Sequence, residues 1–271
     1  MTSDPTVPFV PKKVHVAAVG FEVDRVAEPI VQMRGDLAIL VANIETGDLA
    51  SRFRQGVEKR LRDAGIPTEV ERAPIFDLNE TCETFLRVFR AHSEDRVYFN
   101  ASSGSKVQVL SGYIATMIAS AEGLDVEAYY AEPLRYAPTK GEPLSRGFRR
   151  AFSLPRLTLR VPDSQLRAAL EELENGPLSK FRLASRLARR GVLENARLDS
   201  SGRPGDSAAR ASLHGKVETR VVRPLVEWGF VTTPRVGRDV RVTLTDEGRQ
   251  AIRFFCKVTN DKEVDESRRK G

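Results

Sequence analysis

The stretch Arg96-Val-Tyr-Phe-Asn100-Ala-Ser-Ser-Gly-Ser-Lys106 passes from an extended apolar run into a turn of small residues. A helical pattern, Lys106-Val-Gln-Val-Leu-Ser-Gly-Tyr-Ile-Ala-Thr-Met-Ile-Ala-Ser120, follows at once. A Gly and Ser turn between a strand and a helix leaves backbone N–H groups without acceptors at the helix start. The turn from Asn100 to Lys106 therefore predicts an anion site for phosphate or carboxylate. A capped helix start with no ligand is the alternative.

Similar apolar runs recur on both sides of this stretch, with helical patterns between them. Near-continuous apolar strands that alternate with helices predict a Rossmann-like, doubly wound α/β domain whose parallel sheet is covered on both faces. In such sheets ligands bind at the carboxyl ends of the strands, close to the point where the strand order reverses. The expected strands are 14–19, 37–42, 68–72, 97–99 and 126–130, and the expected helices are 26–33, 48–64, 79–92 and 105–121.

Two familiar nucleotide-binding patterns are missing from this half. A single glycine, Gly20, follows the first strand where a dinucleotide-binding enzyme has three. Gly104-Ser-Lys106 lacks both the earlier glycine and the hydroxyl residue after lysine that a P-loop needs. These absences argue against nicotinamide, flavin and P-loop ATP chemistry. The loop at 20–25 and the turn at 101–105 remain candidates for recognition.

Catalytic and metal-binding patterns are also missing. Ser102, Ser103 and Ser105 lie outside any Gly-x-Ser-x-Gly elbow, so we expect them to hydrogen-bond a ligand. His15 and His92 have no partners at ligand spacing, and the cysteines are only two. We therefore predict no catalytic residue, no metal and no cofactor.

Charge is distributed unevenly along the 271 residues. Up to Pro155 there are 19 Lys and Arg against 21 Asp and Glu, and the remainder has 24 against 16. A near-neutral module joined to a basic one predicts that the second contacts a polyanion such as nucleic acid, with a solvated basic surface as the alternative. No apolar run approaches the roughly 20 residues of a membrane span, and 1–11 has no signal pattern, so we expect a cytoplasmic protein that contacts no membrane.

The order of elements in the C-terminal half is that of a winged helix-turn-helix. Helical patterns at 163–173 and 179–190 precede a polar stretch at 195–206, where we expect a mobile loop. A third helix at 208–228, two short strands meeting at 235–239 and a final helix from Thr245 complete the pattern. We predict a sensing domain at 1–135, a linker at 136–162 with a short strand at 157–161, a winged helix at 163–258 and a disordered tail at 259–271.

A recognition helix and a wing need exposed cations and small polar residues to contact DNA. Spacing places Arg210, His214 and Val217 on one stripe of the third helix and Lys216, Arg220 and Arg223 on another, and leaves open which stripe meets DNA. A dimerisation or protein-docking role is the alternative. The candidate DNA contacts are Arg210, Ser212, His214, Lys216, Arg220, Arg235, Arg238 and Arg241.

Three motifs together resemble the archaeal transcriptional regulators that join a CARF-like Rossmann domain to a winged helix. They are Val19-Gly-Phe-Glu-Val-Asp-Arg25, Asn100 to Lys106 and Tyr129-Tyr-Ala-Glu-Pro133. The CARF motif after the fourth strand reads as a hydroxyl residue, Gly-Gly-Thr and Lys, and this chain has Ser103-Gly-Ser-Lys106. The phrase Pro224-Leu-Val-Glu-Trp-Gly-Phe-Val231, with Leu244-Thr-Asp-Glu-Gly248, similarly resembles winged helices of bacterial and archaeal regulators.

The resemblance implies a homodimer whose two turns converge on a pocket for a cyclic oligonucleotide such as a cyclic oligoadenylate, and a CRISPR-associated role. Glu22 and Asp24 would bring negative charge near that site, where they accept hydrogen bonds from the ligand or pair with Arg25. The candidate ligand contacts are Gly20, Phe21, Glu22, Arg25, Asn43, Ser102, Ser103, Gly104, Ser105 and Lys106.

The leading hypothesis is a ligand-responsive, dimeric, DNA-binding transcription regulator. One rival is a ring nuclease that slowly cleaves its cyclic ligand, with Lys106 and the adjacent serines positioning a ribose 2′-hydroxyl. Another rival is a DNA-binding architectural protein that responds to no ligand.

Overall fold

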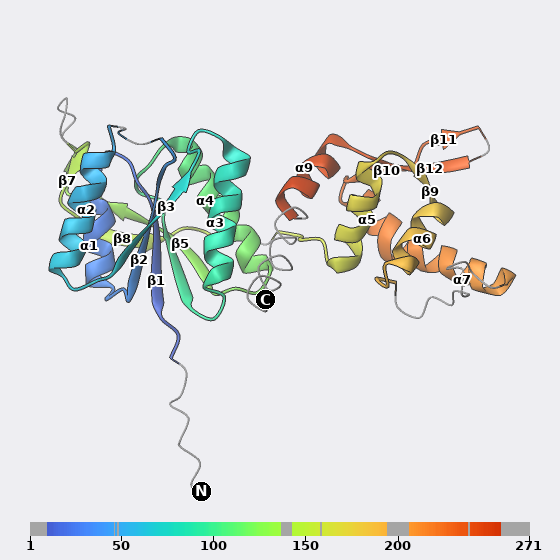
Figure 1. Ribbon diagram of the computed structural model, residues 1–271, viewed down its shortest axis with the longest axis horizontal. Helices are drawn as coiled ribbons and strands as arrows, with labels where there is room; N and C mark the ends of the chain where they lie inside the picture. The colour runs from blue at the N-terminus through green and yellow to red at the C-terminus, as the bar shows by residue number, and fades with distance from the viewer. Residues whose placement is uncertain are drawn as a thin grey trace, which may run out of the picture. The chain divides into compact units, whose positions relative to one another are not determined.

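The computed structural model describes residues 10–45, 47, 49–136, 143–157, 159–193, 206–237 and 239–255 (Figure 1). They form two compact units that divide between Arg160 and Val161. Each unit has a core of its own, as expected for a chain of this length.

The first unit is built on a six-stranded sheet of order β3-β2-β1-β4-β5-β8. Five strands are parallel and match the predicted ones. The apolar runs of β1, β2 and β4 are buried on both faces, whereas β3 lies at the edge of the sheet and is partly exposed. The strand order reverses between β1 and β4, so the loops that follow these two strands meet at the switch point. The parallel strands are β1 Lys13–Ala18, β2 Leu37–Asn43, β3 Thr68–Ala73, β4 Arg96–Asn100 and β5 Val126–Glu132.

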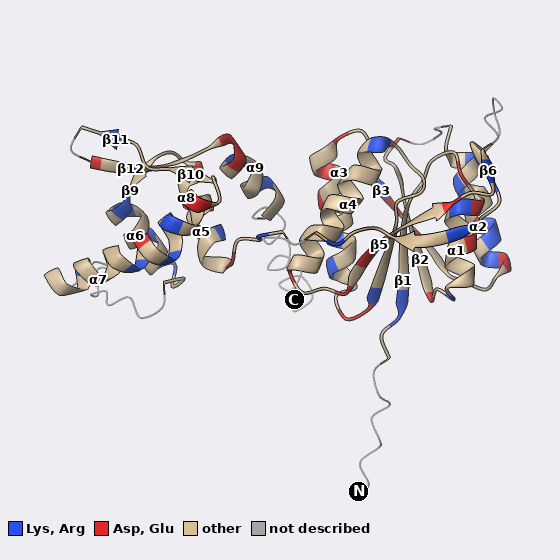
Figure 2. Ribbon diagram, turned by 180° about the vertical axis from the view of Figure 1, so that it is seen from behind, with Lys and Arg blue, Asp and Glu red and all other residues tan. Residues whose placement is uncertain are grey.

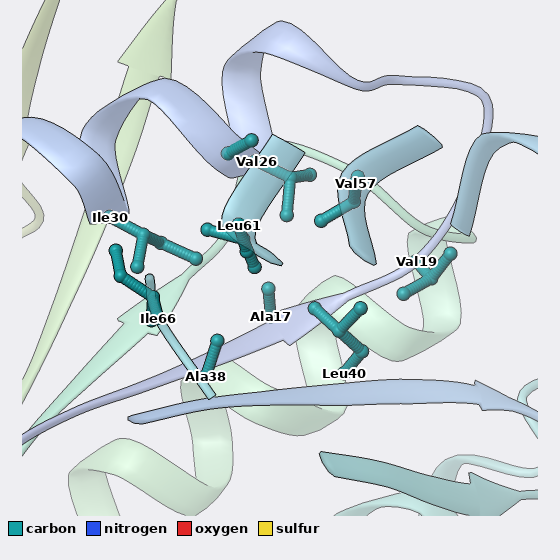
Figure 3. Packing of buried hydrophobic residues seen from close by; sticks show 10 residues of the cluster. Ala17, Val19, Val26, Ile30, Ala38, Leu40, Val57, Leu61 and Ile66 are labelled. Atoms are coloured by element: carbon teal, nitrogen blue, oxygen red, sulfur yellow. The ribbon is translucent and has the colours of Figure 1, made fainter. Parts of the chain in front are cut away.

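Helices cover both faces of this sheet, which confirms the doubly wound architecture. Helices α1 (Asp24–Gln32) and α2 (Ser51–Asp63) pack together on one face, and α3 (Leu78–Ala91) and α4 (Lys106–Ala121) pack together on the other (Figure 1). Figure 3 shows the core beneath α1 and α2, formed by Ala17, Val19, Val26, Ala27, Ile30, Ala38, Leu40, Val57, Leu61 and Ile66.

Residues 136–162, expected to be a linker, contribute strands to the first unit. Strand β8 (Arg150–Ser153) pairs antiparallel with β5 and extends the sheet, and β6 (Arg135–Tyr136) pairs with β7 (Ser145–Arg146) in a small hairpin. The strand predicted at 157–161 is wrong, since none of the residues described there forms one. The free edge of β5 is occupied by β8 instead, and this long-range pairing leaves little trace in sequence.

The second unit has the element order of a winged helix, as predicted. Its sheet has the order β10-β12-β11, with β9 paired to β12. The expected mobile loop at 195–206 lies almost wholly outside the described residues, and the expected tail at 259–271 lies entirely outside them. The elements are α5 Ser164–Glu174, β9 Leu178–Ser179, α6 Lys180–Arg189, α7 Ser207–Val217, the π-helical segment η1 Glu218–Val222, α8 Arg223–Glu227, β10 Val231–Thr232, β11 Arg235–Val236, β12 Asp239–Leu244 and α9 Asp246–Phe255.

The third predicted helix is continuous from α7 through η1 to α8, but its middle turn is widened. Pro224 has no N–H to donate to the carbonyl of Arg220, and its ring would crowd that carbonyl. The N–H of Arg223 bonds instead to the carbonyl of Glu218, five residues earlier, as a π-helical turn requires. The sequence thus explains the irregularity, although a straight helix is the simpler expectation.

Within the described part of the chain, every helix is too short or too polar to cross a bilayer.

Candidate functional site

The loops after β1 and β4 meet at the switch point through their backbones. Gly20 N–H donates to Ser103 Oγ at 3.1 Å. A Cβ on Gly20 would lie 2.6 Å from the backbone nitrogen of Gly104, and a Cβ on Gly104 would lie 2.6 Å from the Cβ of Ala18. Gly104 also has a φ of +96°, which side chains disfavour. Both glycines are therefore required by this close approach.

The serine side chains of the turn hold neighbouring backbone. Ser102 Oγ accepts a hydrogen bond from Ala131 N–H at 2.6 Å, and Ser103 Oγ accepts the bond from Gly20. Ser105 Oγ accepts from Gln108 N–H at 3.0 Å and donates to the carbonyl of Ile75 at 2.8 Å. All three oxygens therefore shape the turn.

Gln108 completes a capping box that the sequence analysis missed. Its Oε1 accepts from Ser105 N–H at 3.0 Å, and its Nε2 donates to the carbonyl of Val41 at 3.0 Å. The Ser-x-x-Gln pattern at the start of α4 is a recognisable signal for this cap. It fixes the N-terminus of α4 against the end of β2.

Donors remain open at the start of α4. The N–H groups of Lys106 and Val107 belong to the first helical turn and have no acceptor within the helix. The Lys106 side chain is exposed and, among the described residues, has no carboxylate or hydrogen-bond partner. The helix dipole and this ammonium favour an anion at the same place.

Glu22 and Arg25 form a buried pair beside the turn, with each side chain 5% exposed. Their Oε1 and Nη1 atoms lie 3.1 Å apart, Ser145 Oγ donates to Glu22 Oε2 at 2.5 Å, and Arg25 Nε donates to the carbonyl of Ala131 at 2.8 Å. The guanidinium also stacks over the ring of Tyr130 at 4.7 Å. The pairing of Glu22 with Arg25, one of two expectations for this acid, is confirmed, and both charges are turned away from solvent.

The β6–β7 hairpin holds the loop after β1 in place. Leu144 N–H donates to the carbonyl of Phe21 at 3.0 Å, and Gly147 N–H donates to Asp24 Oδ2 at 2.7 Å. Asp24 thereby gains an internal partner, as Glu22 does from Ser145. Glu22 and Asp24, the two acids expected near the phosphate site, thus both have hydrogen-bond donors within the protein.

The other predicted ligand contacts also lie at the carboxyl edge of the sheet. Phe21 is 40% exposed and packs edge-on against Phe53 with ring centroids 5.4 Å apart. Asn43 ends β2 and is mostly buried. The structure brings Gly20, Phe21, Asn43 and the turn from Ser102 to Lys106 to this edge.

The same edge carries exposed apolar side chains. Ile44 follows β2, Phe76 follows β3 and Leu110 lies in the second turn of α4, with exposed fractions of 59%, 74% and 54%. Three exposed apolar side chains therefore belong to elements that end or begin at this edge.

In the second unit, α7 has one buried and one open side. Leu213 and Val217 are buried, so Val217, which spacing places on the stripe of Arg210 and His214, cannot contact DNA as those two exposed residues could. The exposed side carries small residues at helical spacing, flanked by polar ones. These exposed residues are Ala208, Arg210, Ala211, Ser212, His214 and Gly215.

The remaining predicted DNA contacts differ in their surroundings. Lys216 is half-buried and Arg220 is exposed, and both have interactions within the protein. Arg235 is exposed on β11. Arg241 is half-buried on β12, and within the described part of the chain its Nε atom has no hydrogen-bond partner. Arg238 lies outside the described residues.

Two cations of α6 pair with acids on neighbouring elements. Figure 2 shows Lys and Arg along this helix. Nζ of Lys180 lies 2.7 Å from Glu218 Oε2, and Nη1 of Arg186 lies 3.2 Å from Glu172 Oε2. These pairs join α6 to η1 and α5. Because Lys180 and Arg186 are paired with acids, fewer positive charges of α6 are available to a polyanion than its sequence suggests.

Comparisons with known proteins match each unit separately. Residues 13–136 match the model of the HFX_2341_N-like N-terminal domain family. Residues 165–256 match the DUF6293 C-terminal winged helix domain. The uncharacterized protein MJ1513 of Methanocaldococcus jannaschii is 27% identical over 127 residues, which are 44% of this chain and 38% of that protein. The chain thus matches well under half of that relative's length.

Among solved structures, Can2 from Sulfobacillus thermosulfidooxidans in complex with cyclic tetra-adenylate aligns over 86% of this chain and 76% of its own, with a TM-score of 0.37 and 11% identity. Csm6 from Enterococcus italicus, bound to cyclic hexa-2′-fluoro-hexa-dAMP, aligns over 80% and 58%, with a TM-score of 0.37 and 12% identity. The strand order of the first unit and the family match at residues 165–256 show that the chain combines a mixed α/β domain, whose sheet is mostly parallel, with a C-terminal winged helix domain.

Proposed function

We propose that this protein is a homodimeric transcription regulator that binds a phosphate-bearing nucleotide through its first unit and double-stranded DNA through its winged helix. The observation that carries the proposal is the open side of α7. Small residues leave its backbone accessible, and Arg210 and His214 flank them. The same chain carries an anion turn at the switch point of the other unit.

DNA binding is supported by the shape and charge of α7. A helix enters the major groove best when its outward side chains are small or can hydrogen-bond base edges. Ala208, Ala211 and Gly215 permit close approach, while Ser212 and His214 supply polar atoms. Arg235 on the wing is placed on a separate element, where it can contact the phosphate backbone.

Ligand binding is supported by the start of α4. Its free N–H groups and the exposed Lys106 ammonium suit a phosphate, and the compensated acids Glu22 and Asp24 do not oppose one. A cyclic oligonucleotide such as cyclic tetra-adenylate, which the motif resemblance implies, is the ligand we propose.

Dimerisation is supported by the apolar edge. Ile44, Phe76 and Leu110 are exposed beside the turn, and covering them with a second copy would bring two turns together. Light scattering after size exclusion is expected to give twice the chain mass, and Leu110→Glu is expected to give the monomer. A monomer at all concentrations would contradict this part.

We further propose recognition without cleavage. Ser102, Ser103 and Ser105 each use their oxygen to hold backbone, so they are poorly placed to activate a ribose hydroxyl. Cyclic tetra-adenylate incubated with the protein for a day should elute unchanged from reverse-phase chromatography. Linear products that depend on Lys106 would favour the ring nuclease instead.

The regulatory step is tested by DNA binding with and without ligand. A ligand shifts an equilibrium only when it binds the two arrangements with different affinity. We expect fluorescence anisotropy to show salt-sensitive binding to DNA flanking the protein's own gene, with an affinity that cyclic tetra-adenylate changes. Binding that is unaltered by ligand and by Lys106→Ala would favour the architectural role, and no salt-sensitive binding would exclude DNA as the partner.

A further inference from the structure

Positive charge in the first unit is concentrated in one segment, residues 135–156. This segment has six Lys or Arg and one Asp or Glu, whereas residues 1–134 have 14 Lys or Arg against 20 Asp or Glu. Its described part forms most of β6 together with β7 and β8. Because the rest of the unit is acidic, the net charge attracts a long polyanion to this segment and disfavours it elsewhere on the unit.

Strand β8 is exposed over its whole length. It lies at one edge of the sheet, paired with β5, and all four of its residues are exposed. In this pairing Phe152 lies opposite Tyr130, and Arg150 lies opposite Glu132. Because alternate residues of a strand share a face, one face of this edge carries an aromatic pair next to a charged pair.

Three aromatic rings gather beside this edge. The ring centroids of Tyr130 and Phe152 are 5.5 Å apart, and the hydroxyl oxygens of Tyr130 and Tyr136 are 3.2 Å apart. Tyr136 is 63% exposed and Phe152 is 45% exposed. The guanidinium of Arg25 lies 4.7 Å from the ring centroid of Tyr130 and 6.0 Å from that of Tyr136. These contacts hold both tyrosine rings before a partner binds, which lowers the entropic cost of stacking on them.

Exposed guanidinium groups surround the rings. Arg149 Nη1 lies 3.8 Å from Glu132 Oε1, and Arg150 Nε lies 2.8 Å from Glu132 Oε2, so two cations share one carboxylate. Arg135 on β6 is exposed and, among the described residues, has no carboxylate within ion-pair distance. The cluster therefore keeps a net positive charge. Together these side chains form the β8 surface, which consists of Tyr130, Arg135, Tyr136, Arg149, Arg150 and Phe152.

We propose that the β8 surface binds single-stranded RNA. Unpaired bases present flat faces that stack on exposed aromatic rings, while guanidinium groups bind the phosphates between them. A duplex hides those faces, and an acidic peptide would match the charge but not the rings. The β8 surface shares no residue with the predicted ligand and DNA contacts, so this inference goes beyond the proposed function.

The tyrosine pair favours RNA over DNA. The hydrogen bond between Tyr130 and Tyr136 uses one of their two hydroxyl protons. Among the described residues the other proton has no acceptor, so it can be donated to a ribose 2′-hydroxyl.

Fluorescence anisotropy of the full-length protein with a short, fluorescein-labelled RNA strand tests the proposal. Loss of one stacking ring should weaken binding by roughly fivefold to a hundredfold in Phe152→Ala, and Phe152→Tyr, which keeps a ring, should bind as the wild type does. Arg135→Gln should lower the slope of log affinity against log salt by about 0.7. Circular dichroism melting checks that each variant is folded.

Phe181→Ala is the matched control in the second unit. Phe181 is 44% exposed and lies on α6, so its loss removes a similar ring away from the β8 surface. We expect this variant to bind the RNA unchanged, and Phe152→Ala to bind duplex DNA unchanged. Weakening by Phe181→Ala or by Arg210→Gln, without weakening by Phe152→Ala, would assign the RNA to the winged helix and overturn the proposal.

Two competitors separate the remaining occupants. Cyclic tetra-adenylate in excess should not displace the RNA, since displacement would place the strand at the turn from Ser103 to Lys106. A DNA strand of the same sequence should bind more weakly, and Tyr136→Phe should reduce this difference. Equal or tighter binding of DNA would overturn RNA as the occupant. Binding of a labelled oligoglutamate peptide that depends on Phe152, without any binding of RNA, would overturn nucleic acid altogether.

Discussion

Gly20 N–H donates a hydrogen bond to Ser103 Oγ across 3.1 Å, although 83 residues separate them in sequence. This bond joins the loops after β1 and β4 at the point where the strand order reverses. It also places the start of α4 beside the loop after β1. The geometry of the candidate anion site therefore depends on a contact between two small residues.

Replacing Gly20 by alanine should damage this junction. The new Cβ would lie 2.6 Å from the nitrogen of Gly104 and 2.9 Å from its Cα, and backbone cannot move aside as a flexible side chain can. We expect the free energy of unfolding of the first unit to fall by about 1–3 kcal/mol, as is typical of overpacking. Urea denaturation followed by circular dichroism measures this change.

Gly215→Ala is the matched substitution in the second unit. A Cβ there would meet no atom within 4 Å, and the residue lies in α7. Alanine should therefore stabilise this unit by about 0.5–1 kcal/mol. The single tryptophan, Trp228, belongs to the second unit, so its fluorescence reports that change separately. If Gly20→Ala and Gly215→Ala both lowered the free energy of unfolding, the clash of the new Cβ at Gly20 would not explain the loss there.

His15 should make the first unit less stable in mild acid. The side chain is fully buried on β1, stacked on Tyr98, and burial together with the nearby Lys13 lowers its pKa to about 4. At pH 7 the imidazole is neutral in both the folded and the unfolded states. Below pH 6.5 the unfolded chain binds a proton that the folded protein excludes, so the free energy of unfolding falls by about 3 kcal/mol between pH 6.5 and 4.

His15→Phe provides the control for this prediction. It keeps an aromatic ring beside Tyr98 but cannot bind a proton. The difference in free energy of unfolding between wild type and variant should therefore shrink or change sign as the pH falls from 7 to 4. A difference that is constant with pH would assign the acid sensitivity to other groups.

Arg210 and Arg186 should contribute differently to DNA binding. Arg210 is exposed on the open side of α7, whereas Arg186 is paired with Glu172 at 3.2 Å. We expect Arg210→Gln to weaken binding about tenfold and to lower the slope of log affinity against log salt by about 1. Arg186→Gln should leave the slope unchanged. Equal effects in anisotropy titrations over 50–200 mM salt would place the interface elsewhere.

The thiol of Cys82 should be inert in the folded protein. The residue is fully buried on α3, and burial is the main cause that raises the pKa of its thiol to about 12. With Cys256 replaced by serine, Ellman's reagent should modify no thiol at pH 8 until urea unfolds the first unit. Rapid modification of this variant without denaturant would show that the segment around Cys82 opens.

The sequence by itself determined the main elements, because their hydrophobic periodicity is strong and local. The parallel strands from Lys13 to Glu132 and the helices between them are where apolar runs and amphipathic patterns predict them. The hairpin at the wing is likewise specified locally, by Gly237 with a φ of +65°.

Only the tertiary structure decided which side chains face the site. Glu22 and Ser145 are 123 residues apart, and no local pattern predicts that their hydrogen bond buries the acid beside Arg25. The same holds for β8, whose pairing with β5 depends on a free sheet edge, and for Val217, which is buried although spacing places it on the stripe of Arg210 and His214. Periodicity specifies a face for each element, but long-range packing decides what that face meets.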